Sequence, residues 1–253
     1  MSSDGLLGGP ALTGEGFPDL MPSMVRDILL VSSLYDSFIL EEDGRFADKL
    51  FSQYLELNLR SPPRIIGAST GQEGLKLLEQ RDFDLVILMP RIPDMSTESL
   101  ARQIREHSPR LPVVRLTFDA TEQIGRSAEA SADVFDRTFQ WKGDNRLLLV
   151  LVKSIEDMLN VEHDTREGMV RVIVLVEDSP AEYSSYLTLL YREVMEQTRS
   201  IIADSLNPLD RRRRVRARPK ILLATTYEEA VDLIDWPEGF CRRDIAWRAL
   251  RTH

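Results

Sequence analysis

Short apolar runs alternate with amphipathic helical segments, and this order restricts the fold more than any other feature. Five runs are expected to be β-strands: Asp27–Val31, Arg64–Ala68, Asp84–Leu88, Leu111–Thr117 and Ala132–Asp136. Segments with apolar residues at helical spacing separate or follow them: Glu41–Leu59, Gly71–Arg81, Thr97–His107, the weaker Thr121–Ala130, and the long Asp144–Asn160. Because parallel strands need crossovers that cover the sheet, we predict an α/β fold, a doubly wound five-stranded parallel sheet.

Composition excludes several classes of protein. A single cysteine, Cys241, rules out an internal disulfide and a cysteine-rich zinc site. The net charge of -9 argues against a nucleic-acid partner. No apolar run approaches the ~20 residues of a membrane helix, and the first residues do not resemble a signal peptide. We therefore expect a cytoplasmic protein without membrane contact, and we expect the Gly- and Pro-rich residues 1–24 to be a flexible tail.

The carboxyl ends of the first and third strands mark the expected ligand crevice. In a doubly wound sheet this crevice lies where the strand order reverses, between those two strands. Their ends read Val31-Ser32-Ser33 and Leu88-Met89. The third strand belongs to the stretch "DLVILMPRIPDMS", in which an aliphatic run stops at Met89-Pro90.

This stretch is similar to the third-strand motif of bacterial response-regulator receiver domains, including Pro93 four residues after position 89. "LPVVRLT" resembles the fourth strand of that family, and "SADVFD" resembles the segment that leads to the fifth. The resemblance covers about residues 26–159. It implies a flavodoxin-like receiver fold and a role in two-component phosphorelay signalling.

The resemblance also implies a phosphoacceptor aspartate, an acidic pair that binds Mg²⁺, a Thr or Ser, and a Lys. Here Met89 stands at the position of the aspartate, and Ser32 and Ser33 stand at the positions of the acidic pair. Thr138 stands at the position of the lysine, so only Thr117, at the position of the Thr or Ser, fits. A methionine has no nucleophilic oxygen and is a poor ligand for a hard cation. We therefore expect a degenerate phosphoacceptor site, no catalytic residues and no enzymatic activity. The alternative is a functioning phosphoacceptor in which Asp36 or Asp94 substitutes for the missing aspartate.

A second unit begins with "VRVIVLVEDSPAEYSSYLTLLY". Val170–Val176 is expected to be a buried strand, and Glu177 and Asp178 at its end resemble the acidic pair of a receiver. They predict partial Mg²⁺ binding; we expect no other cofactor. The competing interpretation is an ordinary helix start, since acidic residues and Ser before Pro180 favour one regardless of metal.

Lys220–Ile234 then repeats the strand and helix of the segment from Arg64, and no third strand follows. We therefore predict a receiver-like domain at 25–160, a linker at 161–169 and an incomplete second copy at 170–253. The second copy carries an Arg-rich insertion at 207–219, which we expect to be solvated. A two-stranded pair leaves apolar surface open, so it should dock on the long helix of the first unit.

These features predict a non-catalytic, tandem receiver-like signalling module. It would act by binding a protein partner or through a covalently linked output domain. A less specific resemblance is to the regulatory region at the head of proteins related to pyruvate phosphate dikinase or phosphoenolpyruvate synthase. The chain could thus be a truncated regulatory head of such an enzyme.

Overall fold

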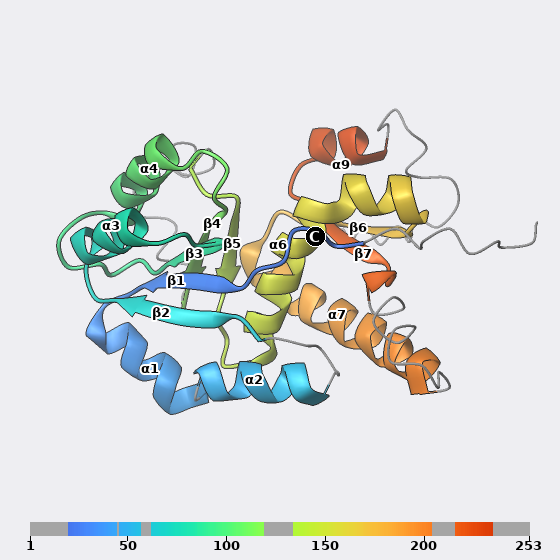
Figure 1. The fold of residues 1–253 in the computed structure, drawn as a ribbon, viewed down its shortest axis with the longest axis horizontal. Helices are drawn as coiled ribbons and strands as arrows, with labels where there is room; N and C mark the ends of the chain where they lie inside the picture. Colours follow the sequence, from blue (N-terminus) through green and yellow to red (C-terminus); the bar gives the residue numbers. More distant parts are fainter. Residues whose placement is uncertain (1–19, 45, 57–61, 119–133, 204–215, 235–253) are drawn as a thin grey trace, which may run out of the picture.

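A computed structural model describes residues 20–44, 46–56, 62–118, 134–203 and 216–234 (Figure 1). A five-stranded parallel sheet with strand order β2-β1-β3-β4-β5 forms the first unit. Its strands are β1 (Asp27–Val31), β2 (Arg64–Ala68), β3 (Leu85–Leu88), β4 (Val113–Thr117) and β5 (Arg137–Gln140). This is the flavodoxin-like order, so the predicted fold class is confirmed.

Helices cover both faces of this sheet (Figure 1). α3 (Gly71–Gln80) and α4 (Thr97–His107) pack on one face, against one set of alternate strand residues that includes Leu29 and Val86. α1 (Leu34–Gly44), α2 (Phe46–Glu56) and α6 (Arg146–Gly168) cover the other face, against the set that includes Ile28 and Ile87. Strands buried on both faces read as continuous aliphatic runs, which explains why the sequence pattern located them well. No described helix is long and apolar enough to cross a membrane.

The fifth strand lies later than predicted. Residues 134–136 of the expected strand Ala132–Asp136 form a turn, and β5 starts at Arg137. The Asp136 carboxylate fixes the turn, because it accepts a hydrogen bond from the Val113 backbone N–H (2.7 Å) and pairs with Arg105. Val134 and Phe135 are still buried, but they pack beneath α4. The prediction placed the strand too early because it relied on apolar residues alone.

Two helical predictions also need correction. The first expected helix, Glu41–Leu59, is two helices, α1 and α2, and α1 already begins at Leu34. The expected linker at 161–169 is mostly the last part of α6, which continues to Gly168 and ends at Met169 in a left-handed conformation (φ 48°). The expected helix Thr121–Ala130 lies outside the described residues.

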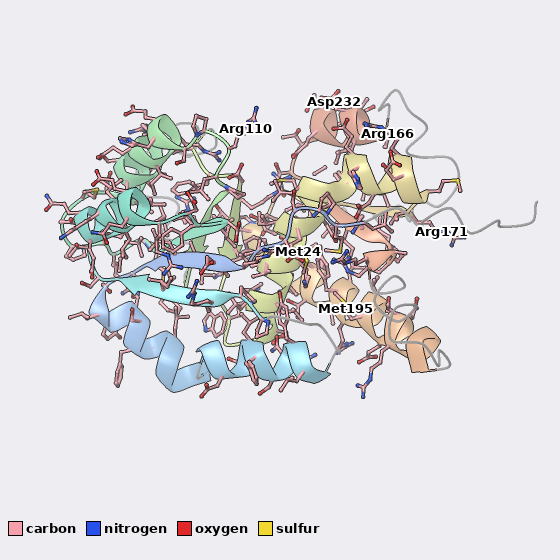
Figure 2. All side chains as sticks on the ribbon, in the orientation of Figure 1. Met24, Arg110, Arg166, Arg171, Met195 and Asp232 are labelled. Atoms are coloured by element: carbon pink, nitrogen blue, oxygen red, sulfur yellow. The ribbon has the colours of Figure 1, made fainter. Side chains whose placement is uncertain are left out.

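A two-stranded parallel sheet forms the second unit, and it packs against the first (Figure 1). Its elements are β6 (Val172–Val176), α7 (Pro180–Ala203), β7 (Lys220–Ala224) and α9 (Tyr227–Ile234). Tyr183, Leu187 and Met195 of α7 belong to the same hydrophobic core as α6, and Met195 is labelled in Figure 2. The predicted docking on the long helix is therefore confirmed for the described part of this unit; residues 235–253 lie outside it.

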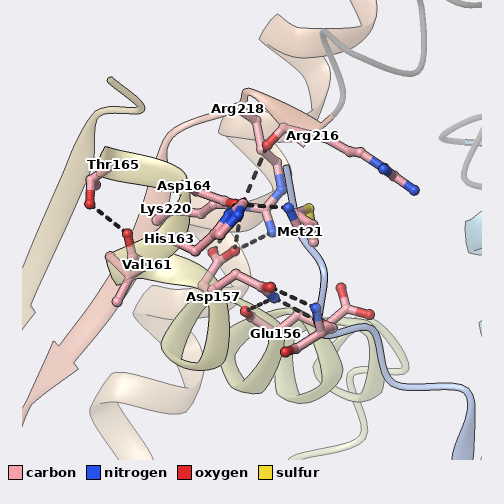
Figure 3. Close-up of polar contacts among 12 residues, drawn as sticks. Met21, Glu156, Asp157, Val161, His163, Asp164, Thr165, Arg216, Arg218 and Lys220 are labelled. Carbon is pink, nitrogen blue, oxygen red and sulfur yellow. Dashed lines mark hydrogen bonds and ion pairs between the residues drawn. The ribbon is translucent and has the colours of Figure 1, made fainter. Parts of the chain in front are cut away.

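Five polar side chains of α6 are buried: Lys153, Glu156, Asp157, Asn160 and Asp164. Figure 3 shows three of them, Glu156, Asp157 and Asp164, where the units meet. The Asp157 carboxylate accepts hydrogen bonds from both terminal nitrogens of Arg218 (2.8 and 2.7 Å) and from the Tyr191 hydroxyl (2.7 Å). Asp164 pairs with Lys220 at 2.7 Å. Glu156 pairs with Lys153 of the same helix at 2.6 Å. Three buried acids thus face three buried bases.

Arg218 corrects the prediction that the Arg-rich insertion is solvated. Its side chain is 1% exposed, whereas Arg211–Arg214 lie outside the described residues. Burial alone would lower the pKa of the Arg218 guanidinium, but the attraction of Asp157 outweighs burial and raises it. Arg218 is therefore a charged interior residue that joins the second unit to α6.

The last residues of the predicted tail also pack on this helix. Leu20 and Met21 are buried, and the backbone N–H groups of three residues donate to α6 side chains. The bonds run from Met21 to Asp164 (2.8 Å), from Ser23 to Asn160 (2.8 Å) and from Val25 to Glu156 (3.1 Å). Residues 20–24 are thus part of the folded unit, while residues 1–19 lie outside the described part.

We predict that Arg218→Ala lowers the free energy of unfolding by about 3–5 kcal/mol, because it leaves the Asp157 charge buried without its cation. Arg166→Ala is the matched control, since Arg166 on the same helix forms an exposed pair with Glu162. That control should cost no more than about 1 kcal/mol. Urea unfolding followed by circular dichroism measures both. Equal losses in the two variants would contradict the importance of the buried pair.

Candidate functional site

The candidate site lies at the carboxyl ends of β1, β3 and β4, where the sheet's strand order reverses. Parallel pairing brings Val31 of β1 level with Leu88 of β3, so Ser32 and Met89 follow at the same edge. Thr117 ends β4 and is 1% exposed. The structure therefore gathers three of the predicted crevice residues.

Met89 is fully buried and belongs to the hydrophobic core on the α6 side of the sheet. Its backbone N–H donates to Val31 O (3.0 Å), which continues the ladder between β3 and β1. Its carbonyl accepts a hydrogen bond from the Thr97 hydroxyl (3.1 Å) at the start of α4. The side chain at this position thus serves packing, and it places no charge at the crevice.

The two serines after β1 form hydrogen bonds with the first turn of α1. The Ser33 hydroxyl accepts a hydrogen bond from the Asp36 N–H (3.1 Å), and the Ser33 carbonyl accepts one from Ser37 N–H (2.9 Å). The Ser32 side chain is buried and shares a hydrogen bond with the Ser37 hydroxyl (2.6 Å). Both serines therefore form a helix start where a metal-binding pair would need carboxylates.

An ion pair that the sequence did not reveal, between a buried carboxylate and a half-exposed arginine, lies at the mouth of the crevice. Asp36 of α1 is 0% exposed, and Arg91 from the loop after β3 approaches its carboxylate at 3.0 Å. The Arg91 guanidinium lies over the rings of Tyr35 (5.5 Å) and Phe118 (5.9 Å). Neither Asp36 oxygen accepts a well-oriented hydrogen bond from the described residues. The pair places a cation, held by two rings, between β3 and α1.

Asp94, the other carboxylate considered as a substitute, lies elsewhere. It accepts hydrogen bonds from the backbone N–H groups of Gly71 (2.7 Å) and Gln72 (2.9 Å) at the start of α3. The hydrogen bonds from Gln72 and Gly71 lower the pKa of the Asp94 carboxyl below its ordinary value. Asp94 thus stabilises a helix end, and of the two carboxylates only Asp36 adjoins the crevice.

The structure also corrects the assignment of Thr138 to the position of the receiver lysine. Thr138 lies inside β5, level with Arg115, and its carbonyl accepts a hydrogen bond from the Tyr183 hydroxyl. Gln140 is the β5 residue level with Thr117. The assignment of Thr138 to the crevice is therefore wrong, and the shift of β5 is the cause.

Two cations on or just after β5 contact the second unit: Arg137 is the first residue of the strand, and Lys142 follows its end. Lys142 donates to the Ala181 carbonyl of α7 (3.1 Å), and Arg137 donates to the Leu223 carbonyl (2.8 Å) and pairs with Glu229 (2.9 Å). Burial, which would raise the pKa of Glu229, is outweighed by hydrogen bonds from Thr225 and by the attraction of Arg137, so that pKa is lowered. Lys142, the cation that follows the carboxyl end of β5, is thus engaged by the interface.

Glu177 and Asp178 lie between β6 and α7, as predicted. The Glu177 carboxylate accepts a hydrogen bond from Ser179 N–H (3.1 Å), which fits the helix-start interpretation. Within the described residues no third His, Cys, Asp or Glu joins the two to form a metal-binding group. A cavity of 860 Å³ opens between α2, α6 and α7, but neither the crevice residues nor this pair line it.

Comparisons with known proteins agree with the fold of the first unit. Residues 38–136 match the sequence model of the family described as the response regulator receiver domain. The match begins inside α1 and ends just before β5, so it includes Met89 and Thr117 but not Ser32 or Ser33. No curated protein matches the chain.

Several solved receiver domains are similar in structure. The receiver domain of an HD domain-containing protein from Pseudomonas fluorescens Pf-5 has 22% identity, covers 55% of this chain and 93% of its own, and gives a TM-score of 0.41. A CheY-like receiver protein from Methanospirillum hungatei JF-1 has 22% identity, with 55% and 98% covered and a TM-score of 0.42. The response regulator TrrA from Thermotoga maritima, in complex with Mg²⁺ and BeF, has 22% identity, with 51% and 98% covered and a TM-score of 0.40. The five-stranded unit therefore contains a segment, residues 38–136, that matches the response regulator receiver domain.

Proposed function

We propose that this protein is a receiver-like signalling module that does not accept phosphate and acts through contact with a protein. The match of residues 38–136 to the receiver family supports the signalling role. The observation that carries the loss of phosphate transfer is the fully buried Met89, which belongs to the hydrophobic core at the strand end where the chemistry requires a nucleophilic oxygen.

The surroundings of Met89 support the same proposal. Metal-assisted phosphoryl transfer needs carboxylates for the cation and a cation for the phosphoryl oxygens. Ser32 and Ser33 hold the start of α1, and Lys142, which follows the carboxyl end of β5, bonds to the second unit. Each residue that would have to change is thus engaged in structure. With no reactive group, the module transmits a signal by binding, either to a separate protein or to a linked output domain.

Asp36 carries the second candidate function, a phosphoacceptor at a displaced position. Its two oxygens have no well-oriented hydrogen bond among the described residues, and it adjoins the crevice. Against this, the side chain is 0% exposed and Arg91 lies 3.0 Å from it, which blocks the approach of a phosphodonor. The further alternative, the regulatory head of an enzyme related to pyruvate phosphate dikinase, stays a prediction.

We predict that the protein forms no phosphoryl adduct with acetyl phosphate and Mg²⁺, because Met89 offers no nucleophile. Intact-mass spectrometry after incubation measures this directly, with Asp36→Asn as the matched variant. An adduct on the wild-type chain that is labile to hydroxylamine and lost in Asp36→Asn would establish the second candidate and refute the first.

We predict that Met89→Asp lowers the free energy of unfolding by about 3–5 kcal/mol, because the new carboxylate would be buried in an apolar core without a cation. Met89→Leu, the matched control, conserves volume and should cost less than about 1.5 kcal/mol. Urea unfolding compares them. Met89→Asp should also fail to form the phosphoryl adduct, since the metal ligands remain absent. A stable Met89→Asp protein that takes up phosphate would show that the site is intact apart from one residue.

A further inference from the structure

The second sheet repeats the pairing of β1 with β2 at the level of single hydrogen bonds. In both pairs the backbone bonds just outside the ladder link equivalent residues. They are Arg64 N–H to Arg26 O (2.7 Å) and Ser32 N–H to Ala68 O (3.1 Å) in the first sheet, and Lys220 N–H to Arg171 O (2.9 Å) and Glu177 N–H to Ala224 O (3.0 Å) in the second. β6 therefore stands to β7 as β1 stands to β2.

The helix that follows each pair starts in the same way. Glu73 accepts hydrogen bonds from the backbone and the hydroxyl of Ser69 (2.7 and 2.9 Å), and Glu229 does so from Thr225 (2.7 and 3.0 Å). The Thr70 hydroxyl in turn accepts a hydrogen bond from Glu73 N–H (3.1 Å). In the second unit the Thr226 hydroxyl accepts one from Glu229 N–H (3.1 Å). The equivalence thus extends beyond the strands and fixes the register of the comparison.

In the first sheet, β1 also uses its other edge. Asp27 O and Val31 O accept hydrogen bonds from the N–H groups of Asp84 (2.9 Å) and Met89 (3.0 Å), on either side of β3. In a parallel ladder alternate residues direct their N–H and C=O groups to the same side. Alternate residues of β1 therefore serve β2 and β3.

The same alternation in β6 places three valines on its outer edge. Arg171 and Glu177 bond to β7, so Val172, Val174 and Val176 direct their N–H and C=O groups the other way. In the described part of the chain the second sheet ends at β6, and this edge has no strand partner.

The outer edge of β7, in contrast, is closed by side chains of the first unit. The Ile221 N–H donates to the Asp157 carboxylate (3.0 Å), and the Leu223 carbonyl accepts from Arg137 (2.8 Å). A strand cannot pair there without breaking both contacts. Among the strands that the structure describes in this sheet, only β6 therefore leaves an edge at which a further strand can pair.

We propose that the outer edge of β6 binds a third parallel strand, supplied as an extended aliphatic segment by a partner protein. The added strand would lie where β3 lies in the first unit. Ile173 and Leu175 pack on the α6 side of the second sheet, while Val172 and Val174 pack on the α9 side. Both faces next to the edge are thus apolar, so the segment needs uncharged aliphatic residues at successive positions, as in Leu85–Leu88.

The exposure of the edge favours a single strand over a second copy of this chain. Val172 and Val174 are 6% and 7% exposed, so the edge is recessed among the elements that cover the sheet. A single extended segment is narrower than a folded domain and so needs less room to enter such an edge. A second copy would have to bring an equally recessed β6 to it. This inference does not depend on whether the first unit accepts phosphate.

A labelled peptide tests the proposal on the full chain. The probe carries the sequence of Asp84–Met89 with a Lys at each end, and fluorescence anisotropy measures its binding. Val174→Pro removes one outward N–H and leaves the bonds to β7 in place, so the peptide should bind this variant about tenfold more weakly. Val174→Thr keeps that N–H and a β-branched shape, and should bind like the wild type; melts of both variants verify folding.

Amide hydrogen exchange supplies an independent measurement. In the protein alone, the N–H groups of Val174 and Val176 should exchange faster than those of Ile173 and Leu175, and adding the peptide should slow them. Equal binding to wild type and Val174→Pro would overturn the proposal, as would the absence of binding. Valine amides already protected in the free monomer would mean that the chain covers its own edge. Protection that depends on protein concentration would mean that a second copy does. Either result would also overturn the proposal.

Discussion

The Asp157 carboxylate of α6 is the contact on which the joining of the two units depends. It binds the Arg218 guanidinium through both oxygens, accepts the Tyr191 hydroxyl, and accepts the N–H of Ile221 at the edge of β7. These donors come from α7, from β7 and from the residues just before it. Removing a carboxylate from water costs several kcal/mol unless partners compensate it, and here the partners belong to different elements. The carboxylate is therefore satisfied only when all of them are in place.

The same interface also occupies the polar groups of β5, the last strand of the first sheet. The open edge of β5 is closed by α7, whose Tyr183 hydroxyl donates to the Thr138 carbonyl and whose Ser184 hydroxyl accepts from Gln140 N–H (3.0 Å). Burial raises the pKa of Tyr183 to about 12, so this donor stays protonated at neutral pH. Lys142 and Arg137 contribute to the same contact surface. Groups along and just after β5 thus bind a protein surface within the chain.

Sequence patterns located β1 to β4 closely, because strands buried on two faces are continuous aliphatic runs flanked by turns. The same logic failed at β5, where Val134 and Phe135 are apolar and buried but lie in a turn that Asp136 fixes through contacts with Val113 and Arg105. Arg218 was misjudged for a related reason. One arginine in a basic run looks like its neighbours, and only the fold shows that it faces a buried carboxylate 61 positions earlier in the chain. The Asp36–Arg91 pair could not be predicted from the sequence either, since the two residues lie on different elements.

The contacts of residues 20–25 with α6 determine when this protein can fold during its synthesis. Met21, Ser23 and Val25 are made early, yet their hydrogen-bond acceptors lie 143, 137 and 131 positions later. Those acceptors in turn lie beside the charges of Asp157 and Asp164, which are neutralised by Arg218 and Lys220. Long-range contacts of this kind slow folding, because the chain between them must be closed first. The five-stranded sheet can begin to form as its strands emerge, but residues 20–25 cannot reach their final place until nearly the whole described sequence has been made.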